Sequence, residues 1–227
     1  MRTIALLLSL LLAAAPARAQ KPEPAMAALL TRLDANRPDL ADACMTAAFE
    51  RRKVTPLLRK PLASSGVLTA SGGALRWETL RPRPGTTVIA GGEMRIVYPD
   101  EKRVEVYDLS VAGGMGFGPA SPLSELTERF EVVEAEPPAW AGADAADPLP
   151  PLIGLRLVPR DAAVAEQLRS IGLGIEEATG AVRLLETVDG DGSSTSYRFA
   201  SPEVKPEPCV IEPPAPEGFE VVRPYGG

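Results

Sequence analysis

The chain has 227 residues, with 24 basic and 30 acidic side chains, no histidine, 5% aromatic residues and a formal net charge of −6. The acidic balance, the lack of an evident basic patch and the few aromatic residues argue against binding to nucleic acid or to anionic lipid. The length suits one large β-rich domain or two small ones, and a continuous array of predicted strands favours one.

The N-terminus has the three parts of an export signal. Arg2 supplies a positive charge, an apolar run follows, and residues 17–19 read Ala-Arg-Ala, which is a small-x-small cleavage site. The run is shorter than the about 20 apolar residues that span a bilayer, which argues against a membrane anchor. We therefore expect residues 1–19 to be a signal peptide cleaved after Ala19, and residues 20–227 to form a single exported domain.

The chain contains two cysteines, Cys44 and Cys209, and the second lies in a stiff, proline-rich segment, residues 202–216. In an oxidising compartment an even number of cysteines favours a disulfide, and the chain-entropy model assigns about 5 kcal/mol to a loop of this length. A second interpretation, with two buried free thiols, stays open.

Residues 24–53 have apolar side chains at helical spacing, and Pro38 predicts a break between two helical segments. The apolar positions are Met26, Leu29, Leu30 and Leu33 in the first segment and Leu40, Cys44, Ala47 and Ala48 in the second.

Short apolar segments separated by glycine and proline fill residues 64–109, which is the pattern of half-buried antiparallel strands. One of them, residues 75–79, alternates apolar with charged side chains. Residues 93–99 and 102–109 flank a Pro-Asp-Glu turn and are expected to form a hairpin.

Residues 112–118, Ala-Gly-Gly-Met-Gly-Phe-Gly, invite comparison with a nucleotide-binding loop. The dinucleotide fingerprint needs G-x-G-x-x-G and the phosphate loop needs Gly-Lys-Ser/Thr, and neither occurs here. We interpret the segment as a mobile connector whose glycines could form the hinge of a lid. Ser121 and Pro122 then predict a helix start, and the stripe that follows is either lid or ordinary core: Leu123, Leu126 and Phe130.

The rest of the chain predicts a return to sheet around one short helix. Residues 155–160 have a strand pattern, Asp161 is a helix cap, and the apolar line of that helix is Val164, Leu168 and Ile171. A hairpin within residues 175–187 and a reversal at 189–192 follow. The two aspartates of the reversal lack the further ligands of an EF-hand loop, so we expect a plain turn and no metal.

The order of these motifs resembles that of the LolA-type outer-membrane lipoprotein carrier proteins. The matching segments are Ser65-Gly66, Leu75-Arg76-Trp77-Glu78, Gly91-Gly92, Ile96-Val97-Tyr98-Pro99-Asp100, Leu155-Arg156-Leu157-Val158-Pro159-Arg160 and residues 217–222. The resemblance implies an α+β, mainly β fold, which is an incompletely closed antiparallel β-barrel with helices covering its concave side.

The same resemblance implies a periplasmic carrier or chaperone that binds the acyl chains of lipoproteins, or another lipid, in an apolar cavity and moves them toward the outer membrane. It implies a monomer without cofactor, served by an inner-membrane donor complex and an outer-membrane acceptor. The implied lipid-binding residues are Leu75, Trp77, Val88, Val97, Val104, Val106, Leu123, Leu126, Phe130, Leu155 and Leu157. An error of one residue in the strand phase would move a side chain to the other face.

One departure from the family concerns the lid. The best-studied carriers have an Arg-Pro pair before the tryptophan-bearing strand, and that Arg helps to close the lid. Here the corresponding positions read Ala70-Ser71-Gly72-Gly73. A lid without this tie is expected to open more readily, so a glycolipid, a fatty acyl intermediate or a pigment stays open as cargo.

Two other function classes remain. A non-catalytic binding or scaffold protein of a cell-envelope lipid or glycolipid pathway is suggested by the proline-rich tail. A lipid hydrolase or transferase is disfavoured because the chain has no histidine, no Gly-x-Ser-x-Gly elbow and no cluster of metal ligands, although 30 acidic residues leave room for a carboxylate pair. We therefore expect no enzyme activity.

Overall fold

The computed structural model describes residues 24–109, 122–140, 148–212 and 217–224. The helical elements of this part are α1 (Pro24–Ala35), η1 (Pro99–Glu101), α2 (Leu126–Arg129) and α3 (Ala162–Gln167). The strands are β1 (Cys44–Val54), β2 (Leu62–Ser71), β3 (Ala74–Arg81), β4 (Gly85–Ala90), β5 (Glu93–Tyr98), β6 (Arg103–Asp108), β7 (Phe130–Glu134), β8 (Leu152–Pro159), β9 (Leu168–Glu176), β10 (Val182–Asp189), β11 (Ser194–Phe199), β12 (Glu203–Lys205) and β13 (Glu220–Val222). The mainly β class is therefore confirmed.

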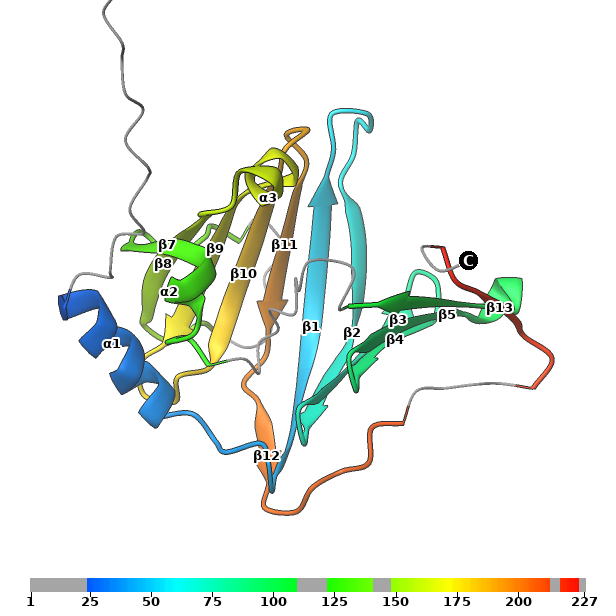
Figure 1. Ribbon diagram of the computed structural model, residues 1–227, viewed down its shortest axis with the longest axis horizontal. Helices are drawn as coiled ribbons and strands as arrows, with labels where there is room; N and C mark the ends of the chain where they lie inside the picture. The colour runs from blue at the N-terminus through cyan, green and yellow to red at the C-terminus, as the bar shows by residue number, and fades with distance from the viewer. Residues whose placement is uncertain (1–23, 110–121, 141–147, 213–216, 225–227) are drawn as a thin grey trace, which may run out of the picture.

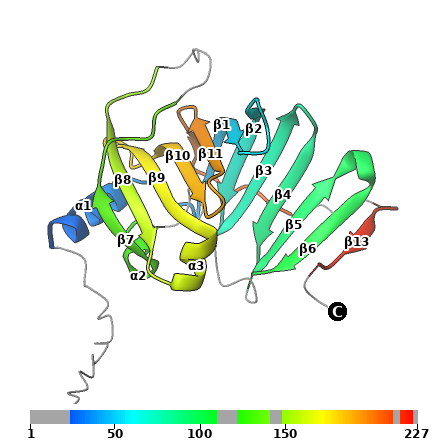
Figure 2. The same cartoon turned by 90° about the horizontal axis from the view of Figure 1, so that it is seen from above.

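All of these strands belong to one 13-stranded sheet, in the order β13-β6-β5-β4-β3-β2-β1-β11-β10-β9-β8-β7, with β12 beside β1. The pairings are antiparallel except that of β13 with β6. Because β13 and β7 lie at opposite ends of this order, the sheet is open, as the sequence predicted. Figures 1 and 2 show that it is strongly curved and that α1 and α2 lie beside the part formed by β7 to β10.

Two of the hairpin turns consist of a glycine pair. Gly72 and Gly73 have φ of 57° and 75°, and Gly91 and Gly92 have φ of 58° and 81°. Two-residue turns that match the twist of the strands need positive φ at both positions, which glycine adopts without a clash. The positions at which the Arg-Pro pair was expected from the resemblance therefore lead into a tight turn between β2 and β3.

The expected second helical segment is wrong, because residues 44–54 form the strand β1. Met45, Ala47 and Phe49 alternate along it and are buried. A short apolar run fits both a helical and a strand period. Pairing with β2 on one side and β11 on the other decides in favour of the strand.

Two short helices also differ from the prediction. The helix expected after Pro122 has only four residues, and Phe130 already begins β7. Asp161 caps α3 as predicted, since its Oδ1 accepts two backbone N–H groups at 2.8 and 3.0 Å. This helix ends before Leu168 and Ile171, which are buried in β9 instead.

The C-terminal tail is fastened to the start of β1. Cys44 and Cys209 are joined by a disulfide with a Cα–Cα distance of 5.3 Å, and β12 pairs with the same end of β1. The Cys209 N–H donates to Ser71 Oγ at 3.1 Å, and this hydroxyl donates to the Ala43 carbonyl at 2.8 Å. The bridge thus holds the tail to a strand, and not to a helix as expected.

The predicted signal peptide, the glycine-rich segment 112–118 with its expected hinge, and Ser121 lie outside the described residues.

Candidate functional site

One face of the sheet is lined by a continuous set of mostly apolar side chains. Directly paired residues of antiparallel strands point to the same side. A first row of paired residues crosses β1 to β5 and consists of Met45, Ala70, Leu75, Ile89 and Met94. A second row, two residues along, consists of Ala47, Leu68, Trp77, Thr87 and Ile96.

Aromatic side chains show that the sheet curls toward this face. Trp77 of β3 and Tyr197 of β11 are separated by two intervening strands, yet their ring centroids are 5.3 Å apart. Neighbouring strands are about 4.8 Å apart, so a flat sheet would hold these two backbones about 14 Å from each other. Phe49 and Phe199 complete the group, at 5.3 and 5.8 Å from Trp77. Burial raises the pKa of Tyr197, and the nearby Arg51 opposes this shift.

The larger pocket on this face lies between α2, α3 and the strands β9 and β10, and has a volume of about 880 Å³. Its apolar lining comes from Phe130, Val164, Leu168, Ile171 and Leu185. The charged residues that line it include Arg129, Arg160, Asp161 and Asp189. Apolar walls with a few polar groups at the rim are typical of sites for small amphipathic ligands.

A second pocket, of about 370 Å³, lies at the other end of the sheet, next to the end of α1. Its apolar wall includes Met45, Leu68 and Phe199, and its polar side includes Arg37 and Glu176. Glu176 Oε2 lies 2.9 Å from Nη1 of Arg183, a residue with 1% of its surface exposed. The Nε of the same arginine donates to the Phe199 carbonyl at 3.1 Å, so this ion pair positions the ends of β9, β10 and β11.

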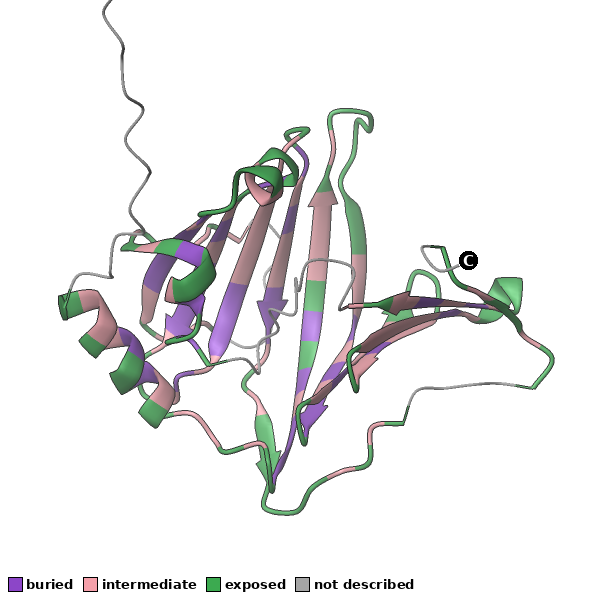
Figure 3. Cartoon of the chain, viewed as in Figure 1, coloured by how far each residue is buried: buried purple, intermediate pink, exposed green. Residues whose placement is uncertain are grey.

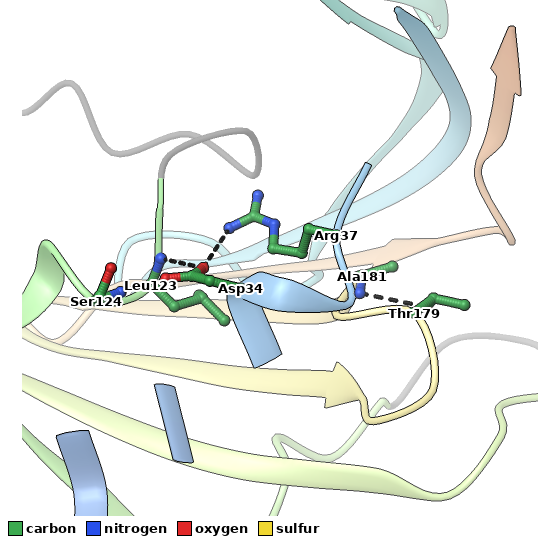
Figure 4. Close-up of polar contacts among 6 residues, drawn as sticks. All are labelled: Asp34, Arg37, Leu123, Ser124, Thr179 and Ala181. Carbon is green, nitrogen blue, oxygen red and sulfur yellow. Dashed lines mark hydrogen bonds and ion pairs between the residues drawn. The ribbon is translucent and has the colours of Figure 1, made fainter. Parts of the chain in front are cut away.

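A carboxylate ties α1 to the segment before α2 (Figure 4). Asp34 accepts the backbone N–H of Leu123 at 2.7 Å and that of Ser124 at 2.9 Å, and it lies 3.5 Å from the Arg37 guanidinium. Burial raises the pKa of Asp34, but the two backbone hydrogen bonds, a further bond from the Ser124 side chain and the charge of Arg37 outweigh it, so that the pKa lies below its ordinary value. Leu123 is fully buried behind this tie, against Leu30 and Leu33 of the helix.

The structure divides the predicted lipid-binding residues into two groups. The first belongs to the buried cluster on the concave face and includes Leu75, Trp77, Leu123, Leu126, Phe130, Leu155 and Leu157. Of these, Phe130 lines the larger pocket.

The second group points to the opposite face, so the expectation that all these residues share one cavity is wrong. Val97 pairs with Val104, and both pack with Val106 and Phe219 in a separate cluster. Val88 lies on that side too, because it pairs with Arg95, the partner of Val106. The strand phase that the sequence suggested for β4 to β6 is shifted by one residue, because apolar residues occupy both phases of these strands.

Several residues of the concave face were missed in the sequence. Ile89, Met94 and Ile96 take the places assigned to the valines, and Met45 and Phe49 were hidden by the helical assignment. Tyr197 and Phe199 alternate in β11, a signal that could have placed them on one face.

In the described part of the chain, no group of three or more histidine, cysteine, aspartate or glutamate side chains is arranged to hold a metal ion. Within the same residues, no helix combines the length and the apolar character needed to cross a membrane.

The chain is similar to an outer-membrane lipoprotein carrier protein of Dechloromonas aromatica, with 30% identity over 169 residues, which covers 71% of this chain and 72% of that protein. Among solved structures, it resembles an uncharacterized conserved protein from Thermus thermophilus, with a TM-score of 0.50, 15% identity and coverage of 88% of this chain and 99% of that one. A LolA superfamily protein from Nitrosomonas europaea matches with a TM-score of 0.39 and 10% identity, over 82% of this chain and 94% of that one. No protein-family model matches the chain.

Proposed function

Because the chain belongs to the outer-membrane lipoprotein carrier family, we propose that it is a periplasmic carrier that binds the acyl chains of a lipoprotein, or of another lipid, on the concave face of its sheet. The observation that carries this proposal is the apolar pocket of about 880 Å³ between α2, α3 and the sheet. Half-buried apolar side chains such as Leu185 line this pocket. Membership of the family suggests a lipoprotein or another lipid as the cargo, and the pocket is a site in which an acyl chain could bind.

The physical need for such a surface follows from the cargo. Exposing an acyl chain to water costs about 0.8 kcal/mol for each CH2 group, so a carrier must keep most of the chain against apolar side chains. The pocket volume lies within the range of about 300–1,000 Å³ that is usual for ligand sites. The half-buried Trp77, Ile89, Met94 and Ile96 extend the apolar surface beyond the pocket.

Export is part of the same proposal. We propose that residues 1–19 are removed after Ala19, and that the mature chain works as a single, monomeric, non-catalytic domain. Its donor would be an inner-membrane complex and its acceptor an outer-membrane site. The disulfide between Cys44 and Cys209 supports this location, because such bonds persist in oxidising compartments.

The scaffold alternative was suggested by the proline-rich tail. In the structure the described part of this tail is bound to the protein itself, through β12 and the disulfide, and β13, which follows the tail in the chain, pairs with β6. This arrangement accounts for the tail without a partner, so we favour the carrier.

The test is the binding of a fluorescent acyl probe and of a triacylated peptide to the processed protein. We expect Leu185→Glu, which places a charge in the larger pocket, to weaken binding at least tenfold, because a charge is costly to hold against an acyl chain. Val133→Glu is the matched control, since Val133 is 38% exposed on β7, outside that pocket. Equal binding by both variants, or none by the parent, would contradict the proposal.

A further inference from the structure

The tip of the β1–β2 hairpin carries large apolar side chains that are open to solvent. Leu57 is 91% exposed, Leu62 55%, Val54 49% and Leu58 47%. Single exposed apolar residues are common on protein surfaces, but a group of four within residues 54–62 is a recognition feature. Because this hairpin end also carries several basic residues, we call residues 51–62 the basic tip.

Residues 51–62 contain five basic residues and no acidic one, in a chain whose net charge is −6. They are Arg51, Arg52, Lys53, Arg59 and Lys60. Among the described residues, neither Arg59 nor Lys60 takes part in an ion pair, and both are exposed. Asp191, in the β10–β11 turn, interacts electrostatically with Lys53 of the tip. The chain therefore has a basic patch despite its net negative charge, and the expectation that it has none is wrong.

The turn that presents these side chains is ordered. The Leu58 N–H donates to the Thr55 carbonyl at 3.1 Å, which closes a turn with Pro56 in its second position. Proline in that position fixes the backbone angle that the turn requires. The backbone that carries Leu57 is thereby ordered before any contact with a partner.

The basic tip stands at the upper end of the sheet and projects beyond the neighbouring β10–β11 turn (Figure 1). Figure 3 shows this hairpin end as exposed. The larger pocket opens toward the same end, because Lys53 pairs with Thr195, which pairs with Thr187 of the pocket wall. A surface that contacts the tip would thus lie on the side of the molecule where the pocket opens.

We propose that the basic tip docks on an anionic lipid surface, with Leu57 and Leu58 inserted at the level of the headgroups and Arg59 and Lys60 bound to the lipid phosphates. Apolar side chains flanked by lysine and arginine are the combination that interfacial membrane binding requires. Because the rest of the chain carries a net negative charge, contact at this end is favoured and would orient the protein. The inference goes beyond cargo binding and does not depend on it.

The experiment is flotation of the purified, processed protein with cargo-free vesicles of phosphatidylcholine alone or mixed with phosphatidylglycerol. We expect binding to the mixed vesicles that weakens as salt is raised. The double variant R59Q/K60Q should lose about fivefold in partitioning for each charge removed. The double variant L57S/L58S should lose at least tenfold on the same vesicles.

The matched controls are Lys205→Gln and Val210→Ser, at the other end of the sheet, where Lys205 is exposed and Val210 is 82% exposed. Both should bind vesicles as the parent does, and unchanged thermal unfolding should show that all variants fold. Equal vesicle binding by the tip variants and the parent overturns the proposal. So does an absence of vesicle binding together with labelling of an envelope protein by a photocrosslinker at position 57, which would assign the tip to a protein partner. Neither result bears on acyl-probe binding in the pocket.

Discussion

The two halves of the sheet bury opposite faces. In β8 and β9 the concave side is buried, with Leu155, Leu157, Leu173 and Ile175 all at 0% exposure beneath α1 and the segment around α2. In β4 to β6 the buried side is the convex one, with Val88, Val97, Val104 and Val106, while Ile89, Met94 and Ile96 on the concave side stay half-buried. The helix-covered half is thus a conventional two-layer core. In the other half, no described helix covers the concave surface, and its apolar side chains stay half-buried.

The difference implies that the two halves of the sheet contribute unequally to stability. Stability comes chiefly from the half that the helices cover, since buried apolar area is the dominant favourable contribution to folding. The other half depends on a smaller cluster with Phe219 and on pairing with β13. Regions with fewer buried contacts open locally at lower free energy, so we expect β4 to β6 to open more readily than β8 and β9.

Truncation of a side chain should destabilise the two halves of the sheet to very different extents. Leu155→Ala should lower the free energy of unfolding by about 2–5 kcal/mol, because it leaves a cavity in a fully packed core. Ile96→Ala should cost about 1 kcal/mol, because a half-buried side chain loses less contact. Urea unfolding of both variants measures the difference, and equal losses would show that the halves are equally packed.

Removing the disulfide should have the next largest effect. Cys44→Ala/Cys209→Ala should lower the free energy of unfolding by about 2–4 kcal/mol, because the unfolded chain loses its closed loop of 165 residues. Hydrogen exchange should quicken in β12 and at the start of β1, where the tail is fastened. An unchanged exchange pattern there would mean that strand pairing alone holds the tail.

Asp34→Asn should weaken the helix-covered half by about 1 kcal/mol, because the amide cannot accept both backbone N–H groups as the carboxylate does. The folded pKa of Asp34 is lowered, so its contribution is present above the ordinary value of 3.8 and is lost as the pH falls below that value through the folded pKa. Unfolding measured from neutral to acidic pH should therefore show a smaller acid-dependent loss in the variant than in the parent. Asp100→Asn, at an exposed position, serves as the control. Identical pH profiles of unfolding for the parent and Asp34→Asn would show that the bonds from Asp34 to Leu123 and Ser124 do not stabilise the protein.

A substitution in the β4–β5 turn should affect only the half of the sheet formed by β4 to β6. Gly92→Ala places a side chain at φ of 81° and should cost about 1 kcal/mol. The loss should appear as faster hydrogen exchange in β4 to β6, with β8 and β9 unaffected. Gly85→Ala in the same half has no positive φ and only an ordinary contact of 3.4 Å with the Val97 carbonyl, so it should be close to neutral.

Much of the fold followed from local signals. The glycine pair at 91–92, the cap at Asp161 and the Pro-Asp-Glu turn each predicted a chain reversal or an element start that the structure contains, whereas the turn at Gly72 and Gly73 was not predicted. Such signals act over a few residues, through allowed backbone angles and side-chain hydrogen bonds. The prediction of β1 failed because an apolar run such as residues 44–49 satisfies two periods at once.

The candidate site was predicted only in part. Leu75, Trp77 and Phe130 were placed on the concave side correctly, because each lies in the same buried cluster. The valines of β4 to β6 were not, since Val88 and Ile89 are adjacent and both are apolar. The larger pocket went unseen because its walls come from α2, α3, β9 and β10, which are brought together only by folding.

Local signals in the sequence located several turns and caps, and the order of its motifs matched that of a family of lipoprotein carriers. Folding determines which face of each strand is covered, how the tail is fastened, and that the leucines of the β1–β2 hairpin are exposed beside its basic residues at one end of the sheet. Turns and caps depend on neighbours in the chain. Burial and surface charge depend on neighbours in space, which an open sheet acquires only when its curvature and its covering helices are in place.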